Sequence, residues 1–190
     1  MSATGRGAVR REGDYYATPA WCVEAILPYL ASRGLLDEGR SALEPAAGDG
    51  AIVRVLRERT KVRVSMIEID PDRATQSGAE CRDFLQYEIP GFDLIITNPP
   101  YRLAFEFAKH GLDLLGRGGA LVLLTRLNWL ASVKRSGWLR EHTPSVFVLP
   151  KRPSFTGQGT DATDYAWLVW GKPNANTRYT PIVRILEVAE

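Results

Sequence analysis

The sequence predicts a doubly wound α/β fold, in which helices cover both faces of a mostly parallel sheet. Three observations support this prediction. Short apolar segments typical of buried strands alternate with longer segments of helical periodicity. A loop containing Gly48 and Gly50 follows the first strand segment, where doubly wound sheets bring the backbone close to ligands. Near the end, strand segments over 145–149 and 165–170 have no helix between them, which predicts an antiparallel hairpin at one edge.

The expected elements follow one another along the chain. Residues 1–13 are rich in Gly, Ser and Arg and are expected to form a flexible arm. A first helix follows, with Thr18 as its N-cap and Pro19 in its first turn, because apolar residues recur at helical spacing between Trp21 and Leu30. Further strands are expected over 41–44, 62–69, 92–97 and 119–125, and further helices over 51–59 and 103–115.

Length and composition indicate an ordinary globular protein. A chain of 190 residues fits one domain, which we expect to span 14–190. No apolar segment approaches the roughly 20 residues that span a bilayer, and we find no signal-peptide pattern. Cys22 and Cys81 lack metal or redox spacing, so we expect a reducing, cytoplasmic location. The net charge of +2 is too small to predict nucleic-acid binding by itself.

The segment Asn98-Pro99-Pro100-Tyr101 carries the most chemical information. Two consecutive prolines end the apolar strand before it, because proline cannot donate to a sheet ladder. Asn98 and Tyr101 are therefore expected on a stiff loop at the carboxyl end of a strand, where open α/β sheets bind ligands. The Asn98 side-chain oxygen and the Pro99 carbonyl are two fixed acceptors beside a ring. They suit a planar heterocycle with an exocyclic amino group.

This segment resembles the signature of the amino-methyltransferases that use S-adenosylmethionine, which is Asn/Asp-Pro-Pro-Tyr/Phe/Trp after the fourth strand. The resemblance implies a Rossmann-like class I methyltransferase fold with a seven-stranded, mostly parallel sheet and one antiparallel edge strand. It implies S-adenosylmethionine as the cofactor and Asn98, Pro99, Pro100 and Tyr101 as the catalytic segment.

The loop from Glu44 to Gly50, Glu-Pro-Ala-Ala-Gly-Asp-Gly, suits a cationic cofactor. It lacks the G-x-G-x-x-G spacing of a dinucleotide site, and its two carboxylates, Glu44 and Asp49, would repel a pyrophosphate. The same carboxylates suit the ammonium and sulfonium groups of S-adenosylmethionine. The alternative is a tight strand-to-helix turn in which Asp49 caps the helix.

Other cofactor residues are expected at the intervals of the family. Glu68 ends a strand 20 residues after Gly48, where a carboxylate can accept both ribose hydroxyls. The resemblance assigns Asp83 to the adenine amino group, Phe84 to the adenine ring, and the motif over 14–19 to the methionine end. The expected cofactor residues are Tyr16, Thr18, Pro19, Glu44, Pro45, Ala46, Gly48, Asp49, Gly50, Glu68, Ile69, Asp83, Phe84 and Asn98.

The same residues suggest how a methyl group is transferred. An adenine amine is a weak nucleophile, and donation of both its N–H groups to Asn98 and Pro99 would aim its lone pair at the methyl. Tyr101 would stack on the base, a contact worth roughly 1–3 kcal/mol. Asn98 cannot act as a general base, so the proton is expected to leave to solvent after attack. We expect no metal, because His, Cys and acidic residues show no ligand spacing.

A duplex base must be flipped out to reach such a site. Phe155 lies where the family places an aromatic that covers the flipped base, although a surface loop with an isolated Phe is the alternative. Between 126 and 152 there are six basic residues and one acid, Glu141, and Trp129 and Trp138 lie among them. Such a segment suits contact with a phosphate backbone and unstacked bases. The alternative is a helix face exposed to solvent. The expected substrate-binding residues are Tyr101, Phe155, Arg126, Lys134, Arg135, Lys151 and Arg152.

The sequence predicts transfer to adenine N6 in DNA. The alternatives are an RNA or ribosomal adenine/guanine methyltransferase, a protein glutamine methyltransferase, and a catalytically silent nucleic-acid-binding module on the same fold. The DNA enzymes usually carry a separate target-recognition domain, and we expect none here, because about twenty residues follow Trp170. We therefore expect loose specificity, a helper recognition subunit, or recognition by the segment 126–160.

Overall fold

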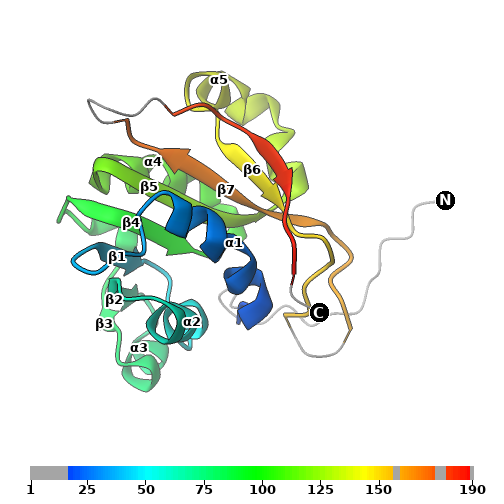
Figure 1. Ribbon diagram of the computed structural model, residues 1–190. Helices are drawn as coiled ribbons and strands as arrows, with labels where there is room; N and C mark the ends of the chain where they lie inside the picture. Colours follow the sequence, from blue (N-terminus) through cyan, green and yellow to red (C-terminus); the bar gives the residue numbers. More distant parts are fainter. Residues whose placement is uncertain (1–16, 156–158, 174–178, 189–190) are drawn as a thin grey trace.

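A single sheet of eight strands forms the centre of the described structure (Figure 1). The computed structural model describes residues 17–155, 159–173 and 179–188. In chain order the strands are β1 (Ser41–Glu44), β2 (Arg63–Glu68), β3 (Glu80–Cys81), β4 (Phe92–Thr97), β5 (Leu115–Arg126), β6 (Ser145–Val148), β7 (Tyr165–Gly171) and β8 (Val183–Ile185). In space their order is β3-β2-β1-β4-β5-β7-β6-β8.

One strand of the described sheet runs against the others. β7 pairs antiparallel with β5 and with β6, whereas the other neighbouring pairs are parallel. The predicted mostly parallel α/β sheet and the antiparallel hairpin of β6 and β7 are therefore confirmed. The expected number of seven strands is wrong, because β8 adds an eighth described strand beyond β6. β8 has only three residues, all exposed, and so short a segment carries no usable periodicity.

Helices lie on both faces of the sheet. They are α1 (Ala20–Ser32), α2 (Ala51–Arg59), α3 (Pro71–Ser77), α4 (Ala104–Leu114) and α5 (Val133–Glu141). Side chains alternate along β5, so that Val122 and Leu124 join the core under α1 and α2, whereas Leu121 and Leu123 join the core under α4. Among the residues described, no helix has the length and apolar character to cross a membrane.

The start of α1 differs from the prediction. Pro19 occupies the N-cap position, and no side chain caps the helix. Thr18, the expected cap, instead accepts a hydrogen bond from Asn98 Nδ2 at 3.2 Å. Its hydroxyl therefore serves the loop after β4 rather than the helix. The arm expected over 1–13 lies outside the described residues.

β5 is longer than the predicted strand over 119–125. It begins at Leu115, directly after α4 ends at Leu114. Gly119 allows this, because a Cβ there would lie 2.7 Å from the Phe92 carbonyl oxygen of β4. The other predicted strands and helices lie within one residue of the observed bounds.

Candidate active site

The carboxyl ends of β1, β2 and β4 meet at one edge of the sheet, because these strands are neighbours and run in parallel. Glu44 ends β1, Glu68 ends β2, and Asn98 follows β4. All three side chains line one pocket. The strand order reverses between β1 and β4, so the pocket lies at the switch point where open α/β sheets bind ligands.

Most of the predicted cofactor residues line this pocket. Those that do are Thr18, Glu44, Pro45, Ala46, Asp49, Glu68, Ile69, Asp83, Phe84 and Asn98. Pro19, Gly48 and Gly50 adjoin lining residues in the chain without lining the pocket themselves. Tyr16 lies outside the described residues. The four acidic residues Glu44, Asp49, Glu68 and Asp83 therefore come together from three separate segments of the chain.

The glycine loop is held against the end of β2 by one carboxylate. Gly48 and Gly50 have φ values of 53° and 78°, a left-handed conformation that favours glycine. The Gly48 amide donates to Glu68 Oε2 at 2.7 Å, and the Asp70 amide donates to Glu68 Oε1 at 3.0 Å. A carboxylate has about four acceptor positions, so Glu68 fixes the loop and keeps capacity for ligand hydroxyls.

Glu44 is a buried acid at the base of the pocket. The residue is 1% exposed, and among the described residues neither carboxyl oxygen has a hydrogen-bond partner of good geometry. Burial raises the pKa of Glu44 well above its ordinary value, and the nearby Glu68 carboxylate raises it further. Thr97 and the Ala46 amide lower the pKa of Glu44 by less than burial raises it. A buried carboxyl without a strong partner is a suitable site for a cationic group.

Asp49 has a second structural role. Its Oδ1 accepts from the Ala51 amide at 3.0 Å, and its Oδ2 accepts from Arg54 Nη2 at 3.2 Å. Asp49 therefore contacts the first amide of α2 while it also lines the pocket, but the N-cap of α2 is Gly50, so the alternative in which Asp49 caps the helix is wrong. Its charge is shared with Arg54, whereas Glu44 has no such ion pair.

Asp83 and Phe84 form the wall of the pocket beyond β3. Asp83 Oδ1 accepts from the Leu85 amide at 2.9 Å and so caps the short helical turn η2 (Phe84–Gln86). Phe84 is buried, with its ring centroid 4.8 Å from that of Phe107 on α4. Phe84 therefore serves the core and the pocket at once.

The stiff loop after β4 is linked to the segment before α1. Asn98 donates to Thr18 across 80 positions of sequence. Pro99 is buried, and the Pro100 carbonyl accepts from the Leu103 amide at 2.8 Å, which starts the helical turn η3 (Tyr101–Leu103). Both prolines and the Thr18 bond therefore restrict how the Asn98 amide can turn.

Tyr101 lies in a second group of aromatic and polar side chains. Its hydroxyl donates to the Tyr165 hydroxyl at 3.1 Å, and the guanidinium carbon of Arg126 lies 4.7 Å from the centre of its ring. The Phe155 ring packs edge-on against Tyr165, with 5.1 Å between centroids. Burial raises the pKa of Tyr101 and of Tyr165, so both hydroxyls keep their protons.

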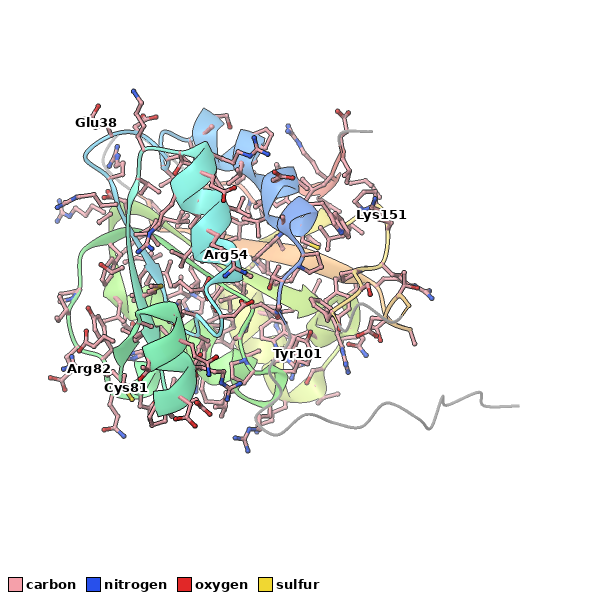
Figure 2. The ribbon with its side chains drawn as sticks, turned by 90° about the horizontal axis from the view of Figure 1, so that it is seen from below. Glu38, Arg54, Cys81, Arg82, Tyr101 and Lys151 are labelled. Atoms are coloured by element: carbon pink, nitrogen blue, oxygen red, sulfur yellow. The ribbon has the colours of Figure 1, made fainter. Side chains whose placement is uncertain are left out.

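The predicted substrate-binding arginines and lysines do not gather at one place. Arg126 lies beside Tyr101, but Arg135 donates to the Trp129 carbonyl and Arg152 pairs with Asp164 at 2.8 Å. Lys151 lies over the Trp21 ring, and Figure 2 shows it well apart from Tyr101. Lys134 is exposed on α5.

Several residues of the site were not predicted from the sequence. Arg73, Arg102 and Phe107 line the pocket, and Asp161 and Tyr165 join the group around Tyr101. Of these residues, only Arg102 could have been proposed from the sequence, because it directly follows the Asn-Pro-Pro-Tyr segment. Arg73 comes from α3, Phe107 from α4, and Asp161 and Tyr165 from the loop before β7 and the start of β7, and only the folded arrangement brings them to the site.

Comparison with solved structures identifies the fold. The structure is similar to that of a candidate class I S-adenosylmethionine-dependent methyltransferase of Listeria monocytogenes, with a TM-score of 0.67 and 13% identity. The match covers 94% of this chain and 68% of the other. The chain has the class I methyltransferase fold. No protein-family model matches the sequence.

Two curated relatives match part of the chain in sequence. A Type II methyltransferase of Thermus thermophilus is 35% identical over 140 residues, which cover 66% of this chain and 32% of the relative. A tRNA1(Val) adenine-N6 methyltransferase of Actinobacillus pleuropneumoniae is 30% identical over 128 residues, which cover 58% of this chain and 52% of the relative. The chain thus spans between a third and a half of the length of these relatives.

Proposed function

We propose that this protein is an S-adenosylmethionine-dependent methyltransferase that methylates the exocyclic N6 amine of adenine in DNA. One observation carries the proposal. The Asn98-Pro-Pro-Tyr101 loop borders a pocket at the switch point whose lining includes Glu44, Glu68 and Asp83. The loop supplies acceptors for an amino group, and the pocket supplies acids for a cationic, ribose-bearing cofactor.

The described residues fit S-adenosylmethionine. Glu44, buried without a strong partner, suits the ammonium and sulfonium end. Glu68 keeps acceptor capacity for ribose hydroxyls, and Asp83 with Phe84 offers an acceptor beside an aromatic ring for adenine. When bound, the cofactor would supply a sulfonium methyl whose carbon an amine nitrogen can attack directly, and the electron pair of the breaking carbon–sulfur bond would leave on sulfur.

The chain's own residues prepare the amine for this displacement. Asn98 Oδ1 and the Pro99 carbonyl accept the two N–H groups of the target amine, which aims its lone pair at the methyl. Thr18 holds the Asn98 amide through its 3.2 Å bond, so the acceptor has a fixed direction. The surplus proton leaves the methylated amine to solvent after transfer, and no side chain has to remove it beforehand. Alignment of this kind supplies most of the rate enhancement that we expect here.

DNA is the favoured substrate. The Type II methyltransferase has the higher identity of the two relatives reported. The Tyr165 ring also contacts both the Phe155 ring and the Tyr101 ring, so Phe155 lies near enough to cover a flipped base that stacks on Tyr101. The tRNA adenine-N6 enzyme favours RNA as the second candidate. Both candidates place the methyl on adenine N6, so the acceptor polymer distinguishes them.

The test is transfer of tritiated methyl from S-adenosylmethionine to duplex DNA, single-stranded DNA, transfer RNA and protein. We expect label in DNA and recovery of N6-methyladenine after nuclease digestion. Label confined to RNA would establish the second candidate, and label confined to protein glutamine would reject both.

The Asn98→Ala variant tests the role of the loop. Removal of the side-chain acceptor should lower the single-turnover rate about 100-fold or more, because the amine is no longer aligned, while cofactor still binds. Asn98→Asp is the matched control, since it keeps an acceptor oxygen and should retain more activity than Asn98→Ala. Undiminished transfer by Asn98→Ala would reject the assigned role.

A further inference from the structure

The Tyr165 hydroxyl lies at the centre of a saturated hydrogen-bond cluster behind Tyr101. It donates to Asp161 Oδ2 at 2.9 Å and accepts from Arg126 Nε at 3.2 Å and from the Tyr101 hydroxyl at 3.1 Å. A tyrosine hydroxyl has one donor and two acceptor positions, so all three are used. Because the Tyr165 proton goes to Asp161, the Tyr101 proton has to point at Tyr165. The direction of the Tyr101 hydroxyl is therefore fixed.

Arg126 holds the same two tyrosines in another way. Its guanidinium carbon lies 4.7 Å from the centre of the Tyr101 ring, while its Nε donates to Tyr165. Arg126 and Tyr165 are also direct partners in the β5–β7 ladder. The face and the hydroxyl of Tyr101 are thus both held by residues on two rigid, paired strands.

The loop that carries Phe155 is attached to the same cluster. The Phe155 ring packs against Tyr165, and the Asp161 amide donates to the Pro153 carbonyl at 2.9 Å. Asp161 therefore connects the Tyr165 hydroxyl to the backbone two residues before Phe155. Tyr165 contacts Phe155 through its ring and Tyr101 through its hydroxyl, so this one residue contributes to the placement of both aromatic side chains.

We propose that Tyr165, held by Asp161 and Arg126, is a positioning residue that sets the spacing between Tyr101 and Phe155 around the target base. The inference rests on the proposed function, because it takes these two rings as the walls that hold a flipped adenine. Tyr165 itself is 1% exposed and does not line the pocket that we assign to the cofactor. Its effect is on alignment of the base and not on cofactor affinity.

The experiment compares Tyr165→Phe with the wild type on the nucleic acid that the wild type methylates. Loss of the hydroxyl should lower the single-turnover rate about 10-fold or more at saturating cofactor and acceptor, because a small misplacement of a reacting group is costly. The dissociation constant for S-adenosylmethionine should stay within about 2-fold of the wild type. With 2-aminopurine in place of the target adenine, Tyr165→Phe should leave the base less stacked and more fluorescent.

Tyr179→Phe is the matched control. The Tyr179 hydroxyl is also central to a hydrogen-bond group, with Ser145 and the Val169 carbonyl. That group lies at the other end of the sheet strands from Tyr101, so its loss should lower thermal stability without changing the transfer rate or the fluorescence.

The outcomes separate the inference from the proposed function. A wild-type rate in Tyr165→Phe, or an equal loss of rate in both variants, overturns the positioning role and leaves the methyltransferase assignment standing. A wild type that methylates no nucleic acid overturns both. Asp161→Asn, which keeps one acceptor oxygen for Tyr165, should lie between Tyr165→Phe and the wild type, and Asp161→Ala should match Tyr165→Phe.

Discussion

At the scale of single residues, the buried carboxyl of Glu44 gives the site a pH dependence. The folded chain holds the Glu44 pKa above its ordinary value near 4.5, so the folded state binds a proton that the unfolded chain releases. The contribution of Glu44 to the free energy of unfolding is therefore lost as pH rises from 4.5 through the raised pKa. A bound cation favours the carboxylate, so cofactor affinity should rise with pH over the same window.

Glu44→Gln should remove this coupling. We expect cofactor affinity to fall about 10-fold or more, because a charged hydrogen bond contributes roughly 1.5–3 kcal/mol, and we expect the affinity to lose its dependence on pH. Calorimetry in buffers of different ionisation enthalpy measures the proton released by the wild type on binding. Glu68, Asp83, Arg73 and Arg102 line the same pocket and are present in both proteins, so the difference belongs to position 44. An unchanged pH profile in Glu44→Gln would assign the coupling to one of those groups.

Residues that line the pocket were predictable from the sequence where a motif contains them. Asn98 was proposed from the Asn-Pro-Pro-Tyr segment, Glu68 from its spacing after Gly48, and Asp83 from the family resemblance, and the fold brings all three to one pocket. Thr18 was assigned to a helix cap, because a threonine before a proline is typical of that position. Its hydroxyl is instead used by Asn98, a contact between residues far apart in sequence that no local pattern contains.

At the scale of elements, the packing of α4 on β5 depends on a glycine. A Cβ at Gly111 would lie 2.8 Å from Leu121 Cδ1, and Leu121 is fully buried. Gly137 on α5 is the opposite case, because a Cβ there meets nothing within 4 Å. The two glycines therefore separate helix propensity from packing.

Gly111→Ala should lower the free energy of unfolding by about 1–2 kcal/mol, since overpacking a core costs roughly 1–3 kcal/mol and exceeds the gain in helix propensity. Gly137→Ala should raise it by about 0.5–1 kcal/mol, because the gain in propensity is unopposed. Urea denaturation of both variants measures whether each substitution raises or lowers the free energy of unfolding. If Gly111→Ala were as stabilising as Gly137→Ala, α4 would not be tightly packed on the sheet.

Elements were predicted well where the period of apolar residues is clear. The strands over 92–97 and 41–44 match the structure, because both are short buried runs with sharp ends. β8 was missed because its three exposed residues carry no pattern, and its pairing with β6 is a long-range contact. The start of β5 was placed too late, because Gly116 and Gly119 suggest a turn when read locally, whereas here they allow close approach to β4.

At the scale of the whole molecule, the pocket joins segments that are distant in the chain. Its lining comes from the segment before α1, the ends of β1, β2 and β4, the turns after β3 and β4, and residues of α2, α3 and α4. A ligand that bridges these segments binds the folded state and not the unfolded chain. It should therefore stabilise the protein as a whole.

S-adenosylmethionine at about 100 times its dissociation constant should raise the free energy of unfolding by about 2.7 kcal/mol. For a chain of this size, that corresponds to a rise of roughly 5–10 °C in Tm. NAD at the same concentration should give no rise, because Glu44 and Glu68 disfavour a pyrophosphate. Differential scanning fluorimetry with the two ligands is the measurement, and a larger rise with NAD would reverse the assignment of the pocket.

The contact between Asn98 and Thr18 has one more consequence. The strands at the middle of the sheet pair with one another, whereas the loop after β4 also depends on the segment before α1, because Asn98 donates to Thr18. Loss of the segment before α1 should therefore abolish catalytic activity without unfolding the sheet. Proteolytic cleavage just ahead of α1 should leave a folded protein that no longer transfers a methyl group.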